Sequence, residues 1–364
     1  IRIRGNMFSM DKSVSFPDTS FVEQRTRLSV TADFTDNVSA FIELDSYDVW
    51  GEDFRSNYVT GLDGRAASVD DVEVYQAYIE AKEMWGTPLK LKVGRQEMEF
   101  GSDWLVGVNN ASSYFQGLSF DALRLDYTTD MFSVTAFASK LAETFQNFGD
   151  DDTDFYGVYA SYLGIEDVSL DAYWLYVRDR VPMQPLSGIP ALATTTSSDL
   201  HTVGLRGSGT IGAFDFQADV AYQFGDLDMD PVWGLFLLHK MDADYDAWGG
   251  NAEVGYTFDA SYAPRVYLGF AYLEGPHGDA LPFNRLFSNW EYSEFIENSD
   301  LSNVYVYRAG VSANPLEALS LSLALTYFVA DQTDSGGWGL WHWSQDSDIG
   351  IEAGLYAAYQ YSED

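Results

Sequence analysis

The chain has 364 residues, of which 46% are hydrophobic and 16% aromatic, and it contains no cysteine. Its 20 Lys and Arg stand against 56 Asp and Glu, which gives a formal charge of −36. This charge excludes nucleic acid as a partner, because a polyanion is bound by a basic surface. The lack of cysteine excludes disulfides, thiolate metal sites and cysteine nucleophiles. No apolar run reaches the roughly 18 residues of a membrane-spanning helix.

Alternation of apolar and polar side chains runs along the whole chain. In 214–224 the apolar residues Phe214, Phe216, Val220 and Phe224 alternate with polar ones such as Asp219. A strand sends successive side chains to opposite faces, so such a segment has one apolar and one polar face. The segments with this pattern are 1–10, 22–34, 38–48, 74–82, 89–93, 119–127, 132–140, 155–162, 168–177, 201–207, 214–224, 248–258, 266–273, 304–313, 319–329 and 349–361. They predict about sixteen strands, with eighteen as the alternative, each about as long as a tilted strand that crosses a bilayer.

The links between these segments alternate between short and long. Short links include 35–37, 128–130, 164–167 and 313–316, and long links lie near 50–71, 101–118, 142–153, 179–199, 225–246, 275–302 and 330–347. This pattern is typical of outer-membrane barrels, which have short periplasmic turns and long extracellular loops. The sequence therefore predicts an all-β fold, a transmembrane antiparallel β-barrel, with residues 1–364 as a single domain and the bacterial outer membrane as its location.

Aromatic residues cluster near the ends of the apolar faces, where they would form girdles at the headgroup level. The candidates are Tyr47, Trp50, Tyr173, Trp174, Tyr176, Tyr256, Phe258, Tyr356, Tyr359 and Tyr361. The alternative is that Tyr and Trp simply form strands well. The uniformly apolar outward faces favour girdles.

Charged residues within the strands lie opposite the apolar face, so we expect them to line a hydrated lumen. The predicted pore-lining or solute-binding residues are Arg25, Arg27, Lys90, Lys92, Arg95, Arg124, Arg206, Arg308, Glu43, Asp45, Glu80 and Asp126. One interpretation is that these charges pair across strands and stiffen the wall. The other is that the arginines bind or steer carboxylates in transit, and the two are compatible.

The long loops are strongly acidic. Asp150, Asp151 and Asp152 could bind Ca²⁺ weakly, although solvated negative loops are the favoured interpretation and no metal or cofactor is expected otherwise. The apolar segment Val232–Leu238 should not lie in water. It is expected either to enter the barrel mouth or to pack on neighbouring loops.

Several segments resemble the alginate-export family of outer-membrane β-barrel porins. The resemblance is clearest at Tyr75–Glu80, Leu91–Glu97, Trp104–Val108 and Ser119–Leu125, and it continues at Pro264–Tyr272 and Leu281–Phe287. It implies a barrel with an Arg-lined lumen that passes an anionic polysaccharide or other acidic solutes, with Arg95 and Arg124, then Lys92, as lumen residues. Strict alternation would turn Arg95 outward, so this assignment also predicts a bulge at Gly94.

The predicted function is passive diffusion of small hydrophilic or anionic solutes, with acidic oligosaccharides or polysaccharides as one possibility. The expected partners are outer-membrane lipid and lipopolysaccharide, the solutes, and two further copies in a homotrimer. The alternatives are a barrel that scaffolds a partner protein and, less favoured, an outer-membrane hydrolase. An enzyme is not expected, because His201, His239, His277 and His342 lack a nucleophile motif and are better explained as loop or girdle residues.

Overall fold

The computed structural model describes residues 1–9, 19–50, 56–57, 62–63, 72–108, 117–143, 152–180, 193–231, 241–294, 301–333 and 347–361. These residues form β-strands and one short 3-10 helix, η1 (Met84–Gly86). None of the described helices is long and apolar enough to cross a membrane. The strands are β1 (Arg2–Phe8), β2 (Thr19–Thr35), β3 (Val38–Val49), β4 (Ser56–Asn57), β5 (Leu62–Asp63), β6 (Glu73–Ala81), β7 (Leu89–Gln96), β8 (Phe120–Thr128), β9 (Phe132–Ala142), β10 (Thr153–Ile165), β11 (Val168–Asp179), β12 (Ala193–Ile211), β13 (Phe214–Pro231), β14 (Met241–Thr257), β15 (Arg265–Leu273), β16 (Ala280–Leu281), β17 (Val304–Leu316), β18 (Leu319–Ala330) and β19 (Asp348–Tyr359).

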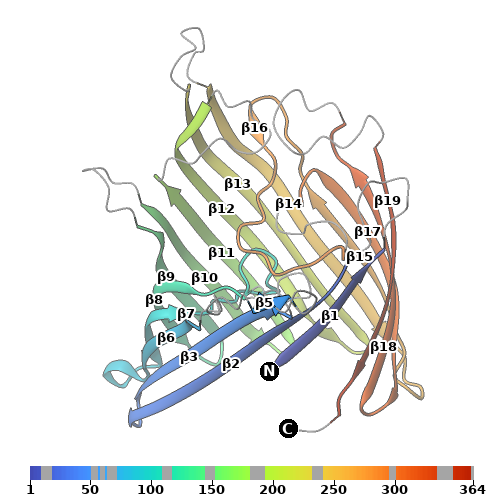
Figure 1. The fold of residues 1–364 in the computed structure, drawn as a ribbon, viewed down its shortest axis with the longest axis horizontal. Helices are drawn as coiled ribbons and strands as arrows, with labels where there is room; N and C mark the ends of the chain where they lie inside the picture. Colours follow the sequence, from blue (N-terminus) through green and yellow to red (C-terminus); the bar gives the residue numbers. More distant parts are fainter. Residues whose placement is uncertain are drawn as a thin grey trace.

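The main sheet is an antiparallel series that curves around an interior and forms a barrel wall (Figure 1). Within the described residues it has 17 strands. One of them, β16, is only two residues long and lies parallel to β14, so sixteen strands follow one another in the wall. The predicted antiparallel fold is confirmed. In the described part of the chain no ladder joins β19 to β1, and the assignment of residues 1–364 to one domain stays a prediction.

The links sort by length as the sequence predicts. At one rim, two residues join β2 to β3, β10 to β11, β12 to β13 and β17 to β18. At the other rim, β7 is joined to β8 through 97–119, and β15 is joined to β17 through 274–303. The rim of short links corresponds to the periplasmic side of an outer-membrane barrel.

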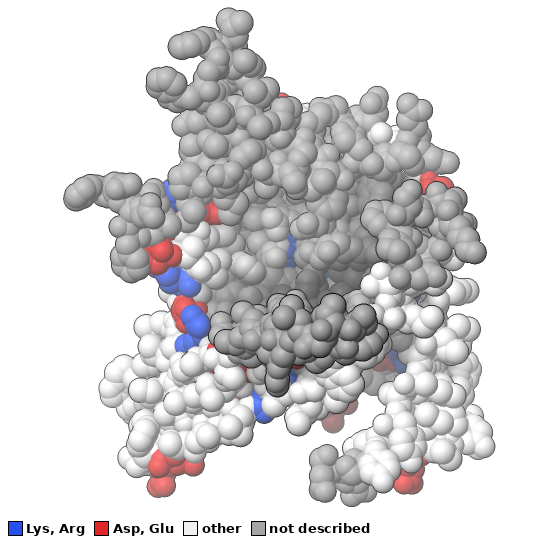
Figure 2. All heavy atoms as spheres, in the orientation of Figure 1, with Lys and Arg blue, Asp and Glu red and all other residues white. Residues whose placement is uncertain are grey.

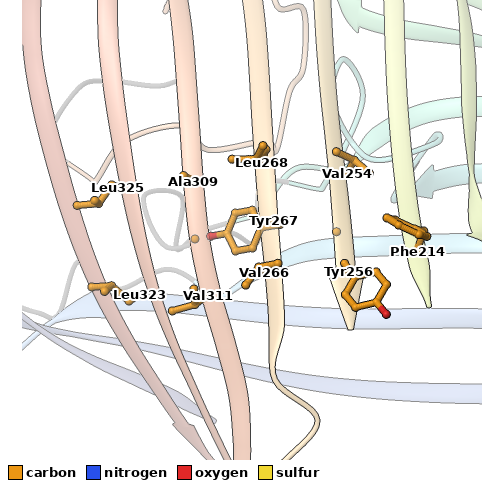
Figure 3. Close-up of a pocket in the computed structure, with 12 residues that line it drawn as sticks. Phe214, Val254, Tyr256, Val266, Tyr267, Leu268, Ala309, Val311, Leu323 and Leu325 are labelled. Atoms are coloured by element: carbon orange, nitrogen blue, oxygen red, sulfur yellow. The ribbon is translucent and has the colours of Figure 1, made fainter. Parts of the chain in front are cut away.

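The two faces of the wall differ in chemistry. On β13, Phe214, Val220 and Phe224 are 54%, 45% and 38% exposed, whereas Asp219 and Gln223 on the other face are buried. The buried face is the inward one, because it contacts loops that fold into the barrel. The outward face carries an apolar groove of about 540 Å³ over β13 to β18, with Val254, Leu268 and Leu323 among its walls (Figure 3). Apolar side chains on this side match the hydrocarbon of a bilayer.

Aromatic side chains form a band of stacked groups on the outward face toward the long loops. Tyr176 stacks on Tyr156 and, with ring centroids 4.1 Å apart, on His201, which in turn stacks on Phe224. Farther along the wall, Tyr222–Trp248, Tyr272–Tyr305 and Tyr307–Tyr327 continue the band. His201 is thus part of an aromatic girdle.

Three of the predicted girdle residues lie on the other face, among them Tyr356, which lines an inward cavity together with Arg308 and Glu352. Tyr173 is 8% exposed and stacks on Tyr159 inside the barrel, at a centroid distance of 5.5 Å. Tyr47 also turns inward, where its hydroxyl donates to Glu23 over 2.6 Å. Nearness to a strand end suggested all three residues, but the odd or even position along the strand decides the face.

Strands β12 to β14 extend well beyond the predicted limits, to 19, 18 and 17 residues. The sequence prediction of loops over 179–199 and 225–246 is therefore wrong where these segments belong to the strands. The extensions still alternate, but their outward positions hold acids such as Asp226 and Asp244 instead of apolar residues. Their inward positions hold the buried Leu227 and Ala243, against which Tyr245 and Leu281 pack. The acidic residues at these outward positions are the reason that the sequence predicted loops where the strands continue.

Candidate functional site in the barrel lumen

Arg27 is the centre of a charge cluster on the inward face of β2. Its Nε lies 3.0 Å from Asp45 on β3, and its Nη1 lies 3.6 Å from Glu43 and 3.3 Å from Glu97. The guanidinium also lies over the ring of Tyr75, 3.7 Å from its centroid. Charge-assisted hydrogen bonds to Asp45 and Glu97 and the longer ion pair with Glu43 fix the position of the guanidinium. Arg25, two residues earlier on β2, faces the same side opposite Tyr47.

A second cluster follows on β6, β7 and β8. Lys92 lies 3.7 Å from Glu80, and Lys90 lies 3.4 Å from Asp126 and 3.9 Å from Glu80. Arg124 donates from Nε to Asp126 over 2.8 Å. The lysine contacts are long, so these ammonium groups keep the capacity to interact with solutes. Cations and carboxylates therefore alternate along this part of the lumen wall.

On the opposite part of the wall, Arg206 of β12 is held by two carboxylates. Its Nη1 lies 2.7 Å from Asp171, and its Nε lies 3.6 Å from Asp219. Arg308 of β17 differs, because within the described residues it makes neither a hydrogen bond nor an ion pair, and its Nε is buried. Pairing thus accounts for most of the predicted lumen cations but not for Arg308.

Arg95 does not lie in the lumen. The register between β7 and β8 runs without interruption from Leu89↔Tyr127 to Gln96↔Phe120, so the expected bulge at Gly94 is absent. Arg95 is 45% exposed on the outward face, where it pairs with Asp121. Gly94 is needed for another reason: it has a φ of +126°, and a Cβ there would overlap the carbonyl oxygen of Ala77 on the next strand. The predicted lumen position of Arg95 is therefore wrong.

Two long loops fold into the barrel and narrow it. Trp104 in 97–108 is 1% exposed, stacks on Phe283 at 5.6 Å, and donates from its indole nitrogen to the Tyr292 hydroxyl over 2.9 Å. The backbones of the two loops are joined by 2.9 Å hydrogen bonds from Gly107 N to Phe287 O and from Phe287 N to Leu105 O. The two loops therefore act as one packed unit, which we call the inner constriction (residues 97–108 and 283–292).

Hydrogen bonds and ring packing hold the inner constriction against one side of the barrel wall. Ser102 donates to Asp219 over 3.0 Å, and the wholly buried Gln223 exchanges two hydrogen bonds with the backbone of Asn284. Phe155 of β10 packs on Phe287, with ring centroids 4.8 Å apart. These contacts were not predicted from the sequence, although the apolar residues in 98–108 were a signal that this loop is buried.

Asp103 lies within this constriction and is partly buried. Burial and the nearby carboxylate of Glu99 raise the pKa of the Asp103 carboxyl to about 6, against the lowering effect of a hydrogen bond from Asn289. The loop therefore carries a group that titrates near neutral pH.

The predicted weak Ca²⁺ site is only partly within the described residues. Asp150 and Asp151 lie outside them, as does the whole of Val232–Leu238. Asp152 accepts a hydrogen bond from Lys140 over 2.7 Å. In the portion that the structure describes, no group of three or more His, Asp or Glu side chains is arranged to hold a metal ion.

Comparisons with known proteins give a similar fold and a family match. The structure of OccK8 (OprE) from Pseudomonas aeruginosa has a similar fold, with a TM-score of 0.54 and 13% identity over 90% of this chain and 82% of that chain. OmpT, an outer membrane protein of Vibrio cholerae, gives a TM-score of 0.49 and 13% identity over 98% of this chain and 94% of that chain. Among curated proteins, none matches the chain. The family model for alginate export matches residues 1–337, so the chain belongs to the alginate export family of the bacterial outer membrane.

Proposed function

We propose that this protein is a passive diffusion channel for small hydrophilic and anionic solutes, acidic oligosaccharides included. Family membership and the barrel fold support a channel. The observation that carries the solute class is the set of inward cations on β2, β7 and β8, of which Lys90 and Lys92 have no carboxylate among the described residues closer than 3.4 Å. Loosely paired cations in a water-filled pore attract anions without binding them too tightly for release.

A channel also fits the two described histidines better than a hydrolase does, whereas His239 and His342 lie outside the described residues. His201 is stacked between Tyr176 and Phe224 on the outward face, away from the lumen. His277 lies 3.9 Å from Glu274, three residues away in the same loop. Neither residue presents a base to a nucleophile, which hydrolysis by a triad requires.

Planar-bilayer recording tests this proposal directly. The purified protein should give stepwise conductance, and the reversal potential in a salt gradient should report its ion preference. Arg124→Ala should shift that potential toward cation preference, because Asp126 then loses its nearest cation. Arg95→Ala is the matched control, since it removes the same charge from the outward face. A sealed barrel without conductance steps would contradict the channel and favour a scaffold for a partner protein.

The quaternary structure and the lipid partners are separate proposals. Assembly as a homotrimer stays a prediction, and native mass spectrometry of the protein in detergent should give the trimer mass. Contact with lipopolysaccharide also stays a prediction, and the same spectra should show bound lipid A after mild extraction.

A further inference from the structure

A polar cavity of about 130 Å³ lies between the inner face of β17 to β19 and the loop residues 291–294. Arg308, Thr326 and Glu352 form its floor, and they lie directly opposite one another in register across the three strands. Ser293 and Glu294 of the loop cover it. Glu294 is exposed, and Tyr356, which also lines the cavity, is 38% exposed, so the cavity opens to the lumen.

Arg308 supplies a positive group at one end of this cavity. The ring of Tyr267 lies beside it, with its centroid 5.8 Å from the guanidinium carbon, and Asn251, Glu253 and Tyr292 line a second, smaller pocket together with Arg308. Its Nε is buried without a hydrogen-bond partner within the described chain. A buried donor left unsatisfied costs free energy, and that cost is recovered when an acceptor from a ligand reaches it.

Carboxylates line the other end of the cavity. The two oxygens of Glu352 accept from the Ser293 hydroxyl over 2.6 Å and from the backbone nitrogen of Glu294 over 3.1 Å. These bonds hold the loop against β19 and fix the Glu352 carboxylate beside the cavity. Thr326 separates it from Arg308, and no ion pair joins the two. Opposite charges thus face a common space without neutralising each other directly.

The charges select the ligand class. Glu291, Glu294 and Glu352 line the cavity against the single cation of Arg308, so a simple anion meets an excess of negative charge. A simple cation meets the unpaired guanidinium. Only a solute that carries both signs satisfies both ends at once, with a carboxylate on Arg308 and an ammonium group near the glutamates.

We propose that this cavity binds a small zwitterion, of the class of free α-amino acids with short side chains. The volume equals that of about four water molecules at roughly 30 Å³ each, which admits glycine or alanine and excludes an oligosaccharide. The inference rests on the proposed channel, because the solute reaches the cavity through the lumen. It adds a binding site for a solute class that the charge clusters on β2 and on β6 to β8 do not select.

Saturation-transfer NMR on the detergent-solubilised full chain tests the site, with glycine, acetate, methylammonium and glycerol as probes. Glycine should bind more tightly than the other three. Arg308→Gln should weaken glycine binding by about tenfold or more, as expected for loss of a charged hydrogen-bond partner, and Arg308→Lys should restore part of it. Lys82→Gln, which removes a cation that is 58% exposed beside the short-link rim, should leave binding unchanged. The heat-dependent gel shift of a folded barrel should be the same for every variant.

The outcomes separate this inference from the proposed function. Equal binding of acetate and glycine would make the cavity a plain anion site and overturn the proposal. Absence of glycine binding, or binding that Arg308→Gln does not weaken, would also overturn it, while conductance in bilayers would leave the channel intact. Glycine binding by a protein without conductance would uphold the cavity and contradict the channel.

Discussion

Arg95 and Asp121 form a bidentate ion pair on the outward face of the barrel. The Nε and Nη2 atoms of Arg95 each donate over 2.8 Å to a different carboxylate oxygen of Asp121. The strand register extends this pair into a row of alternating charge across neighbouring strands, through Lys140, Asp154, Arg178 and Asp199. On β10 to β12 this row lies two residues beyond the aromatic row of Tyr156, Tyr176 and His201, toward the long loops. Figure 2 shows charges of both signs side by side on the left flank of the view, above flanks that are mostly uncharged. The row therefore ends the apolar band on this part of the wall.

Arg95→Ala and Asp121→Ala should leave the ion preference of the channel unchanged, because both side chains lie outside the lumen. The pair is about half exposed, so its coupling free energy should be small, about 0–1 kcal/mol. A double-mutant cycle on urea unfolding in detergent measures this coupling. A shift in reversal potential for either single variant would mean that the face of β7 is assigned wrongly.

Val220→Arg tests the two faces of the wall from the other direction. Val220 is 45% exposed on the outward face of β13, and a charge there should cost about 2–4 kcal/mol if it lies near the bilayer midplane. Assembly into liposomes, followed by the gel shift of the folded barrel, measures the effect. Gln217→Arg is the control, since position 217 faces inward on the same strand, and it should assemble normally. Equal assembly of the two variants would contradict the orientation of β13.

Arg27→Ala should shift the channel toward cations and also destabilise it. The substitution leaves Glu43, Asp45 and Glu97 without their shared cation. Loss of these charge-assisted hydrogen bonds should lower the free energy of unfolding by about 1–3 kcal/mol. Reversal potentials and urea unfolding measure the two effects separately. The double variant Arg27→Ala with Asp45→Asn should recover part of both, and no recovery would mean that the carboxylates are not coupled through Arg27.

The sequence predicted the wall well because the wall obeys a local rule. Alternation fixes the face of a side chain from its position alone, and it places Lys92 and Arg124 on the inward face, as the structure does; their role in solute passage stays a prediction. The prediction for Arg95 failed because this rule was set aside: the family resemblance favoured an inward Arg95, whereas strict alternation places it outward, as the structure does. The long strands β12 to β14 were underestimated because acids replace apolar residues beyond the bilayer, which leaves the period but removes the hydrophobic signal.

The inner constriction could not be predicted in the same way. Trp104 and Phe283 are 179 positions apart in the sequence, and their contact depends on how the barrel brings two loops together. The sequence of a loop indicates that its apolar residues are buried, but it does not show which surface they pack against. That Arg308 has no hydrogen-bond or ion-pair partner among the described residues likewise depends on the neighbours that the fold brings to it.

Trp104→Ala should widen the channel. The indole is buried between Phe283 and Tyr292 and joins the two inward loops, and large-to-small changes at such sites cost about 3–5 kcal/mol. This loss of free energy is large for a contact between two loops, so we expect the loops to separate while the wall stays folded. Single-channel conductance should rise, with the gel shift unchanged. Trp85→Ala is the control, because Trp85 is 84% exposed in the short link before β7. Unchanged conductance for Trp104→Ala would contradict a constriction built on this residue.

The docking of loop 97–108 should strengthen as the pH falls. In the folded protein the pKa of Asp103 is raised to about 6 from an ordinary value of 3.8, so folding favours the protonated form. The contribution of this group is fully present below about pH 4 and is lost as the pH rises through about 6. Glu99 adds like charge, whereas Asn289 and the more distant Arg206 act in the opposite direction without cancelling the shift. Hydrogen exchange in residues 97–108 should therefore slow between pH 7 and pH 5, after correction for the intrinsic exchange rate. Asp103→Asn removes the titrating group, so this variant should show protection at pH 7 close to that of the wild type at pH 5, and its protection should change less with pH. An equally steep pH dependence in the variant would assign the effect to other carboxylates of the lumen.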